Sequence, residues 1–317
     1  MGTTMDAVKN LDAETVFATL SPAEAVAALR TALATDFDPT DDIPRTITDV
    51  TAGNMIFMPA EIGRWVGVKL AGVSVGNPDR GLPRIMAQYL MYDSATLELT
   101  TVIDGAALTT LRTPAVSVAA VEPALSRFTE PVKVLVFGAG PQGTGHVDTI
   151  AEVLDVDLAD VTFVVRSPDQ VAEDVRERGR VLEAQTAEMD AAVRAADIIV
   201  TATTASEPLF SADLVKQGAI VMACGSHDPN SRELPAALFT SAMVVVEDLS
   251  TVLREGGDVI LAIADGALDA DSLVTMKQFT TGAVAPNDDQ TVIFKGSGMS
   301  WEDLAVAAEL VEKKSRS

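Results

Sequence analysis

The middle of the chain alternates short apolar runs with segments long enough to form helices. The runs are rich in β-branched residues and cover residues 132–137, 161–166, 181–186, 197–202, 219–224 and 243–247. Short apolar runs of this kind are typical of strands buried on both faces of a parallel sheet. The pattern therefore predicts an α/β fold in which residues 128–294 form a Rossmann-type, doubly wound parallel sheet.

The first third of the chain follows a different pattern. Its apolar segments, at 46–50, 55–58, 65–73, 85–92 and 96–103, are separated by Gly, Pro, Asn and Asp. This spacing predicts an antiparallel or mixed sheet. Helices are expected after the start signature Ser21-Pro22-Ala23-Glu24, over 106–126 and over 301–314. We expect residues 1–127 and 295–317 to form a smaller α+β domain, to which the last helix returns.

Composition narrows the range of partners. The formal net charge is −23, which argues against nucleic acid and anionic membrane surfaces, because both require a basic face. No apolar run approaches the ~20 residues that cross a bilayer, and no signal-peptide pattern is present, so we expect a cytoplasmic protein. One cysteine and two histidines leave little material for a metal site, and we expect none. An anionic substrate must then be bound by a local cluster of arginine and lysine.

A glycine-rich segment follows the first central strand. Gly138, Gly140 and Gly143 have the GxGxxG spacing of dinucleotide-binding turns, and a helix is predicted to begin near Gln142. The unpaired N–H groups at the start of such a helix bind phosphate. The spacing alone is a weak signal, but here strands and helices follow in alternation. We therefore predict a dinucleotide site that includes Gly138, Ala139, Gly140, Pro141 and Gln142.

The end of the second central strand bears on which cofactor is bound. NAD enzymes usually carry an acidic residue there for the ribose, whereas this chain has Arg166 and Ser167. A guanidinium and a hydroxyl bind phosphate, so NADP(H) is preferred and NAD(H) is the alternative. Arg166 could instead stack on adenine or face solvent. Thr203, after the fourth strand, joins the candidate cofactor set because it lies at the same edge of the sheet.

The loop after the fifth central strand carries His227 and Asp228. In open α/β sheets ligands bind at the carboxyl ends of the strands, so both residues lie where a substrate would meet a nicotinamide. Either is a candidate for proton transfer. Alternatively, His-Asp before Pro229 forms an ordinary turn. Cys224 fits a buried strand residue, and His146 fits a packing or capping residue, better than a catalytic role.

Two cations of the first domain have apolar neighbours. Lys69 lies in the run WVGVKLA, and a buried lysine either loses its proton or binds an anion. Alternatively, it snorkels to water from an edge strand. Arg112 lies near the start of a predicted helix, where the helix dipole disfavours a cation unless an anion joins it. A surface position or a domain-interface ion pair is the alternative for Arg112, and Arg45 by itself fits a surface residue.

Several short motifs follow one another in a characteristic order. They are Met58-Pro59-Ala60, the GVK that ends at Lys69, Gly81-Leu82-Pro83, Leu111-Arg112-Thr113, GAGPQ at 138–142, Ala196-Asp197-Ile198, Arg232-Glu233-Leu234 and FKGSGMSWEDLAVA from Phe294. Together they resemble the ornithine cyclodeaminase/mu-crystallin family along nearly the whole chain. The resemblance implies a homodimer with a substrate-binding first domain and a Rossmann domain for the nicotinamide cofactor. It implies that Arg45, Lys69 and Arg112 hold the carboxylate of an α-amino or α-imino acid, and we add Ser297 and Gly298 to the cofactor set.

The resemblance leaves three hypotheses for the reaction. The leading one is an NAD(P)H-dependent reductase of a small imino acid, such as a pyrroline- or piperideine-carboxylate, in which Lys69, His227 or Asp228 delivers the proton to nitrogen. The first alternative is ornithine cyclodeaminase, which uses bound NAD and releases ammonia, and the second is a non-catalytic NADP(H)-binding protein. His227 stands where the cyclodeaminase pattern has aspartate, and Arg84 stands where a small hydroxyl residue is expected. Both departures favour the reductase.

Overall fold

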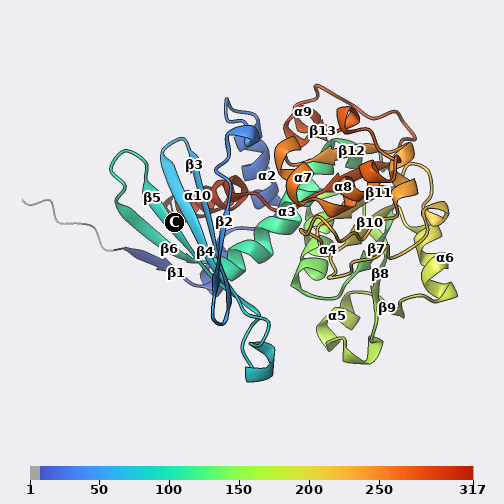
Figure 1. The fold of residues 1–317 in the computed structure, drawn as a ribbon, viewed down its shortest axis with the longest axis horizontal. Helices are drawn as coiled ribbons and strands as arrows, with labels where there is room; N and C mark the ends of the chain where they lie inside the picture. The colour runs from blue at the N-terminus through green and yellow to red at the C-terminus, as the bar shows by residue number, and fades with distance from the viewer. Residues whose placement is uncertain (1–7, 317) are drawn as a thin grey trace, which may run out of the picture. The chain divides into compact units, whose positions relative to one another are not determined.

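The computed structural model describes residues 8–316 of the 317-residue chain. The chain forms two compact units, which we call unit 1 and unit 2 (Figure 1). Of the residues described, unit 1 contains 8–112 and 299–316, and unit 2 contains Thr113–Gly298. The predicted boundaries lay at 127/128 and 294/295, so two short segments move to unit 2. The reason is that helix α3 (Gly105–Leu125) crosses the first boundary as one helix, and strand β14 (Val292–Lys295) belongs to the second sheet.

Unit 1 is built on a mixed six-stranded sheet. In spatial order its strands are β1 (Lys9–Leu11), β6 (Leu99–Asp104), β5 (Ile85–Asp93), β4 (Trp65–Val73), β3 (Gly53–Ile62) and β2 (Thr46–Val50). Strand β1 is parallel to β6, and the other neighbours are antiparallel. The helices of this unit are α1 (Ala13–Thr19), α2 (Pro22–Leu33) and α10 (Ser300–Arg316). The predicted start of α2 is confirmed, because the Ser21 hydroxyl accepts a hydrogen bond from Glu24 N and the Glu24 carboxylate accepts one from Ser21 N.

The two faces of this sheet differ. Side chains alternate between faces along a strand, and in β4 the residues Trp65, Gly67, Lys69 and Ala71 are buried while those between them are half-buried. Helix α10 packs on β3 and β4 and contacts Lys69, so the buried face is the one that α10 covers. Figure 1 shows the red α10 lying beside these blue strands. The sheet therefore places Lys69 on its covered face.

Unit 2 contains the predicted doubly wound sheet. Its eight strands, all in parallel pairs, follow the spatial order β13-β12-β14-β11-β10-β7-β8-β9. Their bounds are β7 (Val132–Phe137), β8 (Leu158–Val165), β9 (Arg180–Glu183), β10 (Ile198–Thr201), β11 (Ile220–Ala223), β12 (Met243–Val246), β13 (Val274–Thr275) and β14 as above. The helices are α4 (Pro141–Val153), α5 (Glu173–Arg178), α6 (Ala187–Ala195), α7 (Leu249–Glu255), α8 (Gly257–Ala264) and α9 (Met276–Thr280). The predicted α/β fold class is confirmed.

One central strand was missing from the prediction. Strand β14 lies between β11 and β12, although it comes last among the strands in the sequence. Its signal is the apolar run Val292-Ile293-Phe294, which is completely buried. The six predicted strands are all present, and β13 is a further short addition at the edge of the sheet.

Short 3-10 turns connect several of these elements. They are η1 (Pro39–Asp41), η2 (Pro78–Arg80), η3 (Pro168–Gln170), η4 (Ala212–Leu214), η5 (Ala236–Thr240) and η6 (Ala270–Ser272). Within residues 8–316 no single helix has the length and hydropathy to cross a membrane, although the bent pair α1 and α2 meets those two criteria jointly. The same residues contain no group of three or more His, Cys, Asp or Glu side chains arranged to hold a metal ion.

Candidate active site

Two of the predicted substrate-binding cations lie together in unit 1, each paired with an acid of α10. Lys69 Nζ is 2.6 Å from Asp303 Oδ2, and Arg112 Nε donates to Asp303 Oδ1 at 3.2 Å. Arg112 Nη1 donates to Glu302 Oε2 at 2.7 Å. All four side chains are buried. We call them the ionic cluster. Lys69 therefore does not snorkel to water, and Arg112 is not a surface residue.

The ionic cluster depends on where α10 begins. Asp42 Oδ2 accepts a hydrogen bond from Ser300 N at 2.8 Å, which satisfies one N–H at the start of the helix. The Ser300 hydroxyl donates to the Ile43 carbonyl at 3.3 Å. These contacts fix the first turn, and the first turn carries Glu302 and Asp303. Sequence reasoning missed both acids as site residues, because acidic residues at the start of a helix are common for electrostatic reasons alone.

Burial sets the titration behaviour of this region. It lowers the pKa of Lys69 to about 8, and the Asp303 carboxylate offsets part of that change. Burial also raises the pKa of Asp42 to about 7, although backbone hydrogen bonds from Trp301 and Ser300 lower that pKa in part. A lysine with a pKa near neutrality can both bind a carboxylate and exchange a proton, so the ionic cluster suits either predicted role of Lys69.

The third predicted cation, Arg45, is half-buried and lies one residue before β2. Thr46 pairs with Phe57, and Met58 pairs with Lys69. If the register of β2 continued by one residue, Arg45 would lie beside Met58, two strand spacings or ~10 Å from the Lys69 backbone and on the same face. Tyr89 is the next residue in this row, and its completely buried hydroxyl has no hydrogen-bond partner among residues 8–316.

The glycine-rich turn of unit 2 has the geometry of a phosphate site. Gly138 has φ +106°, and a Cβ there would lie 2.6 Å from the Ala202 carbonyl oxygen. A Cβ at Gly143 would lie 2.1 Å from the Gly138 carbonyl oxygen, so both positions require glycine. Gly140 is the N-cap of α4, and a Cβ there would meet nothing within 4 Å. Gly140 therefore leaves open space in front of the helix start.

The donors around that space suit a dinucleotide. Within residues 8–316 no side chain caps the start of α4, which leaves its first N–H groups for an anion. Pro141 occupies the first helical position, and Gln142 Oε1 is buried with no hydrogen-bond partner among the residues described. The residues present therefore fit the pyrophosphate of a nicotinamide dinucleotide. Such a cofactor supplies hydride transfer, which amino-acid side chains do not provide.

Arg166 and Ser167 lie just past the carboxyl end of β8, and both are exposed. Strand β8 pairs with β7, and Gly138 N donates to the Val164 carbonyl at 3.0 Å. The parallel pairing therefore brings Arg166 to the same edge as the glycine turn. Arg166 has no hydrogen bond or ion pair with any residue from 8 to 316, which leaves its guanidinium available to a ligand.

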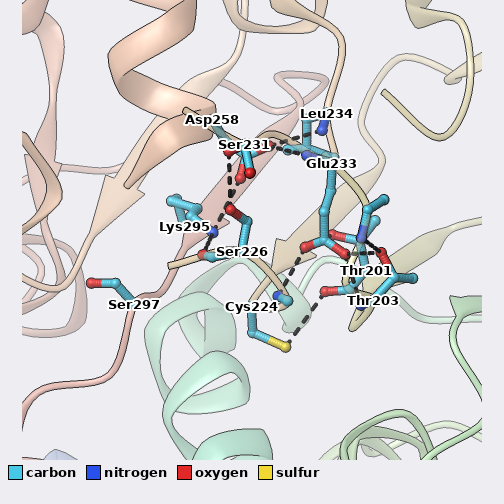
Figure 2. A network of polar contacts seen from close by, with 12 residues as sticks. Thr201, Thr203, Cys224, Ser226, Ser231, Glu233, Leu234, Asp258, Lys295 and Ser297 are labelled. Atoms are coloured by element: carbon cyan, nitrogen blue, oxygen red, sulfur yellow. Dashed lines mark hydrogen bonds and ion pairs between the residues drawn. The ribbon is translucent and has the colours of Figure 1, made fainter. Parts of the chain in front are cut away.

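A buried glutamate joins the ends of two neighbouring strands in unit 2 (Figure 2). Glu233 Oε1 accepts from Thr203 N at 2.8 Å and from Thr203 Oγ1 at 2.7 Å. Its Oε2 accepts from Thr201 Oγ1 at 3.0 Å and from Gly225 N at 2.8 Å. Burial raises the pKa of Glu233, while Lys295 and the Thr203 hydrogen bonds oppose the shift. The hydroxyl of Thr203, a predicted cofactor residue, is thus engaged in holding the end of β10.

A second part of this network holds the loop after β11. Lys295 Nζ donates to the Ser226 carbonyl at 2.5 Å and lies 3.1 Å from Asp258 Oδ2. Asp258 Oδ1 accepts from Glu233 N at 2.7 Å and Leu234 N at 2.8 Å. Lys295, Asp258 and Glu233 are completely buried. Sequence reasoning missed all three, although Glu233 and Lys295 lie within the motifs that carry the family resemblance. The polar chain in Figure 2 therefore links the end of β14 to the loops after β10 and β11.

The two candidate proton-transfer residues of unit 2 lie on that loop. His227 and Asp228 are both exposed. Asp228 Oδ1 accepts from Asn230 N at 2.8 Å, which forms the turn that was the alternative interpretation of this segment. The structure thus places both residues at the carboxyl edge of the sheet, as predicted for a site there, and their catalytic role stays a prediction.

The remaining sequence candidates have structural partners. Ser297 N donates to Glu247 Oε2 at 2.9 Å, and Gly298 N donates to Glu247 Oε1 at 2.9 Å. Their cofactor role stays a prediction. His146 is completely buried, its Nδ1 lies 2.7 Å from the Gln142 carbonyl oxygen, and burial lowers its pKa to about 4. Its Nε2 lies 3.9 Å from Cys224 Sγ. A neutral, enclosed imidazole fits the packing role expected of His146.

The sequence and the fold are similar to those of known proteins. The model of the ornithine cyclodeaminase/mu-crystallin family matches residues 3–317. Ketimine reductase mu-crystallin of Rattus norvegicus is 31% identical over 247 residues, which is 77% of this chain and 74% of that protein. Delta(1)-pyrroline-2-carboxylate reductase of Bacillus cereus is 31% identical over 255 residues, 78% of this chain and 77% of that protein. The structure of Thermococcus litoralis Delta(1)-pyrroline-2-carboxylate reductase in complex with NADH and L-proline shares the fold, with a TM-score of 0.83, 21% identity and coverage of 96% and 97% of the two chains.

Proposed function

Because the chain belongs to the ornithine cyclodeaminase/mu-crystallin family, we propose that it is an NAD(P)H-dependent reductase of a small α-imino acid, of the ketimine or pyrroline-2-carboxylate type. The observation that carries the proposal is the ionic cluster. A buried ammonium and a buried guanidinium, 2.6 and 3.2 Å from one Asp303 carboxylate, are donors suited to a substrate carboxylate. The glycine turn of unit 2 fits the cofactor that such a reduction requires.

In this reaction the C=N double bond of the imino acid becomes CH–NH. The hydride comes from the bound nicotinamide cofactor, and a proton is taken up at nitrogen. Arg112, Lys69 and Arg45 hold the carboxylate, which orients the α-carbon for transfer. Lys69, whose pKa of about 8 suits a general acid near neutral pH, or His227 or Asp228 delivers the proton.

NADP(H) is the cofactor that we propose. Arg166 and Ser167 support this choice, because they offer a guanidinium and a hydroxyl to a 2′-phosphate where an NAD enzyme has a carboxylate. Arg166→Ala should raise the KM for NADPH and leave the KM for NADH unchanged. Arg176→Ala is a matched control, because Arg176 donates to the Pro168 and Val171 carbonyls of the same segment. An equal effect of Arg166→Ala on both cofactors would contradict the preference.

The outer face of the six-stranded sheet supports a homodimer. Val66, Val68 and Leu70 of β4 point away from α10 and are only half-buried, and Phe57 of β3 lies on the same face. An apolar sheet face of this kind is stabilised by a partner, and we propose a second copy of the chain. Leu70→Glu should shift the protein from dimer to monomer in analytical ultracentrifugation, whereas Leu253→Glu, at an exposed position of α7, should not.

The function is tested by following absorbance at 340 nm with purified protein. NADPH and NADH are offered in parallel with pyrroline-2-carboxylate and piperideine-2-carboxylate. Oxidation of NADPH at a higher kcat/KM than NADH is the expected result. Release of ammonia from L-ornithine, with no oxidation in the first assay, would instead identify a cyclodeaminase. Cofactor binding without turnover of any imine or of ornithine would identify a binding protein.

A further inference from the structure

The two acids of the ionic cluster have different contacts. Asp303 uses one oxygen for Lys69 and the other for Arg112, at 2.6 and 3.2 Å. Glu302 contacts Arg112 at 2.7 Å, and its effect on Lys69 ranks below those of Asp303 and Arg112. Both acids are completely buried and adjacent in the sequence. Asp303 is therefore the carboxylate that joins the two cations.

Lys69 retains donor capacity that the protein does not use. An ammonium group has three N–H donors, and burial without partners is costly. Lys69 is 5% exposed, and within residues 8–316 its one hydrogen-bond partner is Asp303. The other groups that face it are the Arg112 guanidinium from α3, the Glu302 carboxylate from α10 and the Tyr89 ring opposite it on β5. The unfilled donors of Lys69 point to a ligand with oxygen or nitrogen acceptors.

We propose that Asp303 is the positioning residue of the reaction, which bridges Lys69 and Arg112, fixes the spacing of the two cations and keeps the Lys69 ammonium available to the imino acid. This inference rests on the proposed function and names the group on which Lys69 depends. Without the Asp303 charge, burial and the repulsion from Arg112 both act on Lys69 with little opposition. Lys69 then loses its proton at lower pH, and the site loses a donor.

The test compares two neutralisations at adjacent buried positions. Asp303→Asn and Glu302→Gln each remove one negative charge, but Asp303 contacts Lys69 and Glu302 contacts Arg112. The pH profile of kcat/KM with NADPH and pyrroline-2-carboxylate is measured for both variants and the wild-type protein. Asp303→Asn should move the alkaline limb down by about one pH unit or more, while Glu302→Gln should leave it within about 0.3 unit. Equal shifts in the two variants would overturn the proposal.

Two further variants keep the proposal testable if Asp303→Asn does not fold. Lys69→Arg cannot lose its proton in the accessible range, so the alkaline limb should disappear. Asp303→Glu keeps the charge but displaces the carboxylate, so kcat/KM should fall while the limb stays in place. A retained limb in Lys69→Arg, or wild-type kcat/KM in Asp303→Glu, would overturn the assignment.

Ligand binding gives a readout that is independent of turnover. The affinity of L-proline for the NADP⁺-loaded protein is measured by calorimetry between pH 6 and 9. The loss of affinity at high pH should begin about one pH unit lower in Asp303→Asn than in Glu302→Gln. Failure of the wild-type protein to reduce any imine would refute the proposed function, whereas activity with identical profiles in both variants would refute the role of Asp303 alone.

Discussion

Both units bury charged groups, but those of unit 2 bind the backbone of neighbouring loops as well as side chains, whereas those of the ionic cluster in unit 1 bind one another. In unit 2, Glu233 and Asp258 accept from four backbone N–H groups in total, and Lys295 donates to a backbone carbonyl. In unit 1 the ionic cluster joins side chains to side chains. A charge bound to the backbone fixes the position of a loop, whereas a buried ammonium with unused donors, such as that of Lys69, can also bind a ligand. The first arrangement suits a scaffold, and the second suits the substrate binding that we propose.

The largest expected effect on stability lies in the unit 2 network. Lys295→Met leaves Asp258 buried without its cation, so the free energy of unfolding should fall by about 3–5 kcal/mol. Urea denaturation measures the loss. Lys216→Met is the matched control, because its ion pair with Asp197 is partly exposed and should contribute less than about 1 kcal/mol. Similar losses in both variants would show that Lys295 is not the anchor of this network.

In unit 1 the main effect should appear in activity. Lys69→Met removes a donor to the carboxylate and a candidate proton donor, so kcat/KM should fall roughly 10²–10⁴-fold. The free energy of unfolding should change less than in Lys295→Met, since Asp303 keeps its contact with Arg112. Lys313→Met, which removes a partly exposed ion pair with Glu24, serves as the control. A variant that loses stability but keeps kcat/KM would reverse the contrast between the two units.

The smallest effect concerns the pH dependence of stability. The pKa of Asp42 is about 7 in the folded protein and near 3.8 when unfolded, so between these values the folded state binds the extra proton. Stability contributed by Asp42 is therefore lost as pH rises toward 7, by on the order of 1–3 kcal/mol. Asp42→Asn, which keeps an oxygen for Ser300 N, should be increasingly stabilised relative to wild type from pH 4 to pH 8. Thermal unfolding of both proteins between pH 4 and pH 8 measures this difference in stability. A difference in Tm that does not change with pH would contradict the assignment.

Much of the fold was predictable because its signals are local. The bounds of β2, β4 and β7 match the predicted segments, since each depends on a continuous apolar or alternating pattern. Strand β14 was missed even though its run is equally apolar, because it lies outside the regular alternation of strands and helices. The family predicted from the motifs is confirmed. Two relatives of the chain are a ketimine reductase and a pyrroline-2-carboxylate reductase, which is the class of enzyme that the leading hypothesis names.

In the ion pairs of the candidate site, the sequence identified the cations but not their acidic partners. Lys69 and Arg112 stood out because a cation among apolar residues needs an anion. Their partners could not be identified in the same way, since Asp303 is 234 residues from Lys69 and Glu302 is 190 residues from Arg112. Glu233 likewise binds Thr201 across 32 residues. Which buried charges meet is decided by tertiary packing, and short-range patterns carry no information about it.

The late position of β14 in the chain has a consequence for biosynthesis. This strand separates β11 from β12, so until the ribosome has released residue 295 those two strands have no shared neighbour. Helix α10, which supplies both acids of the ionic cluster, emerges later still. The sheet of unit 2 is therefore incomplete until β14 has been synthesised, and the facing edges of β11 and β12 lack their partner until then. A premature stop codon between residues 247 and 291 should therefore yield an aggregation-prone product.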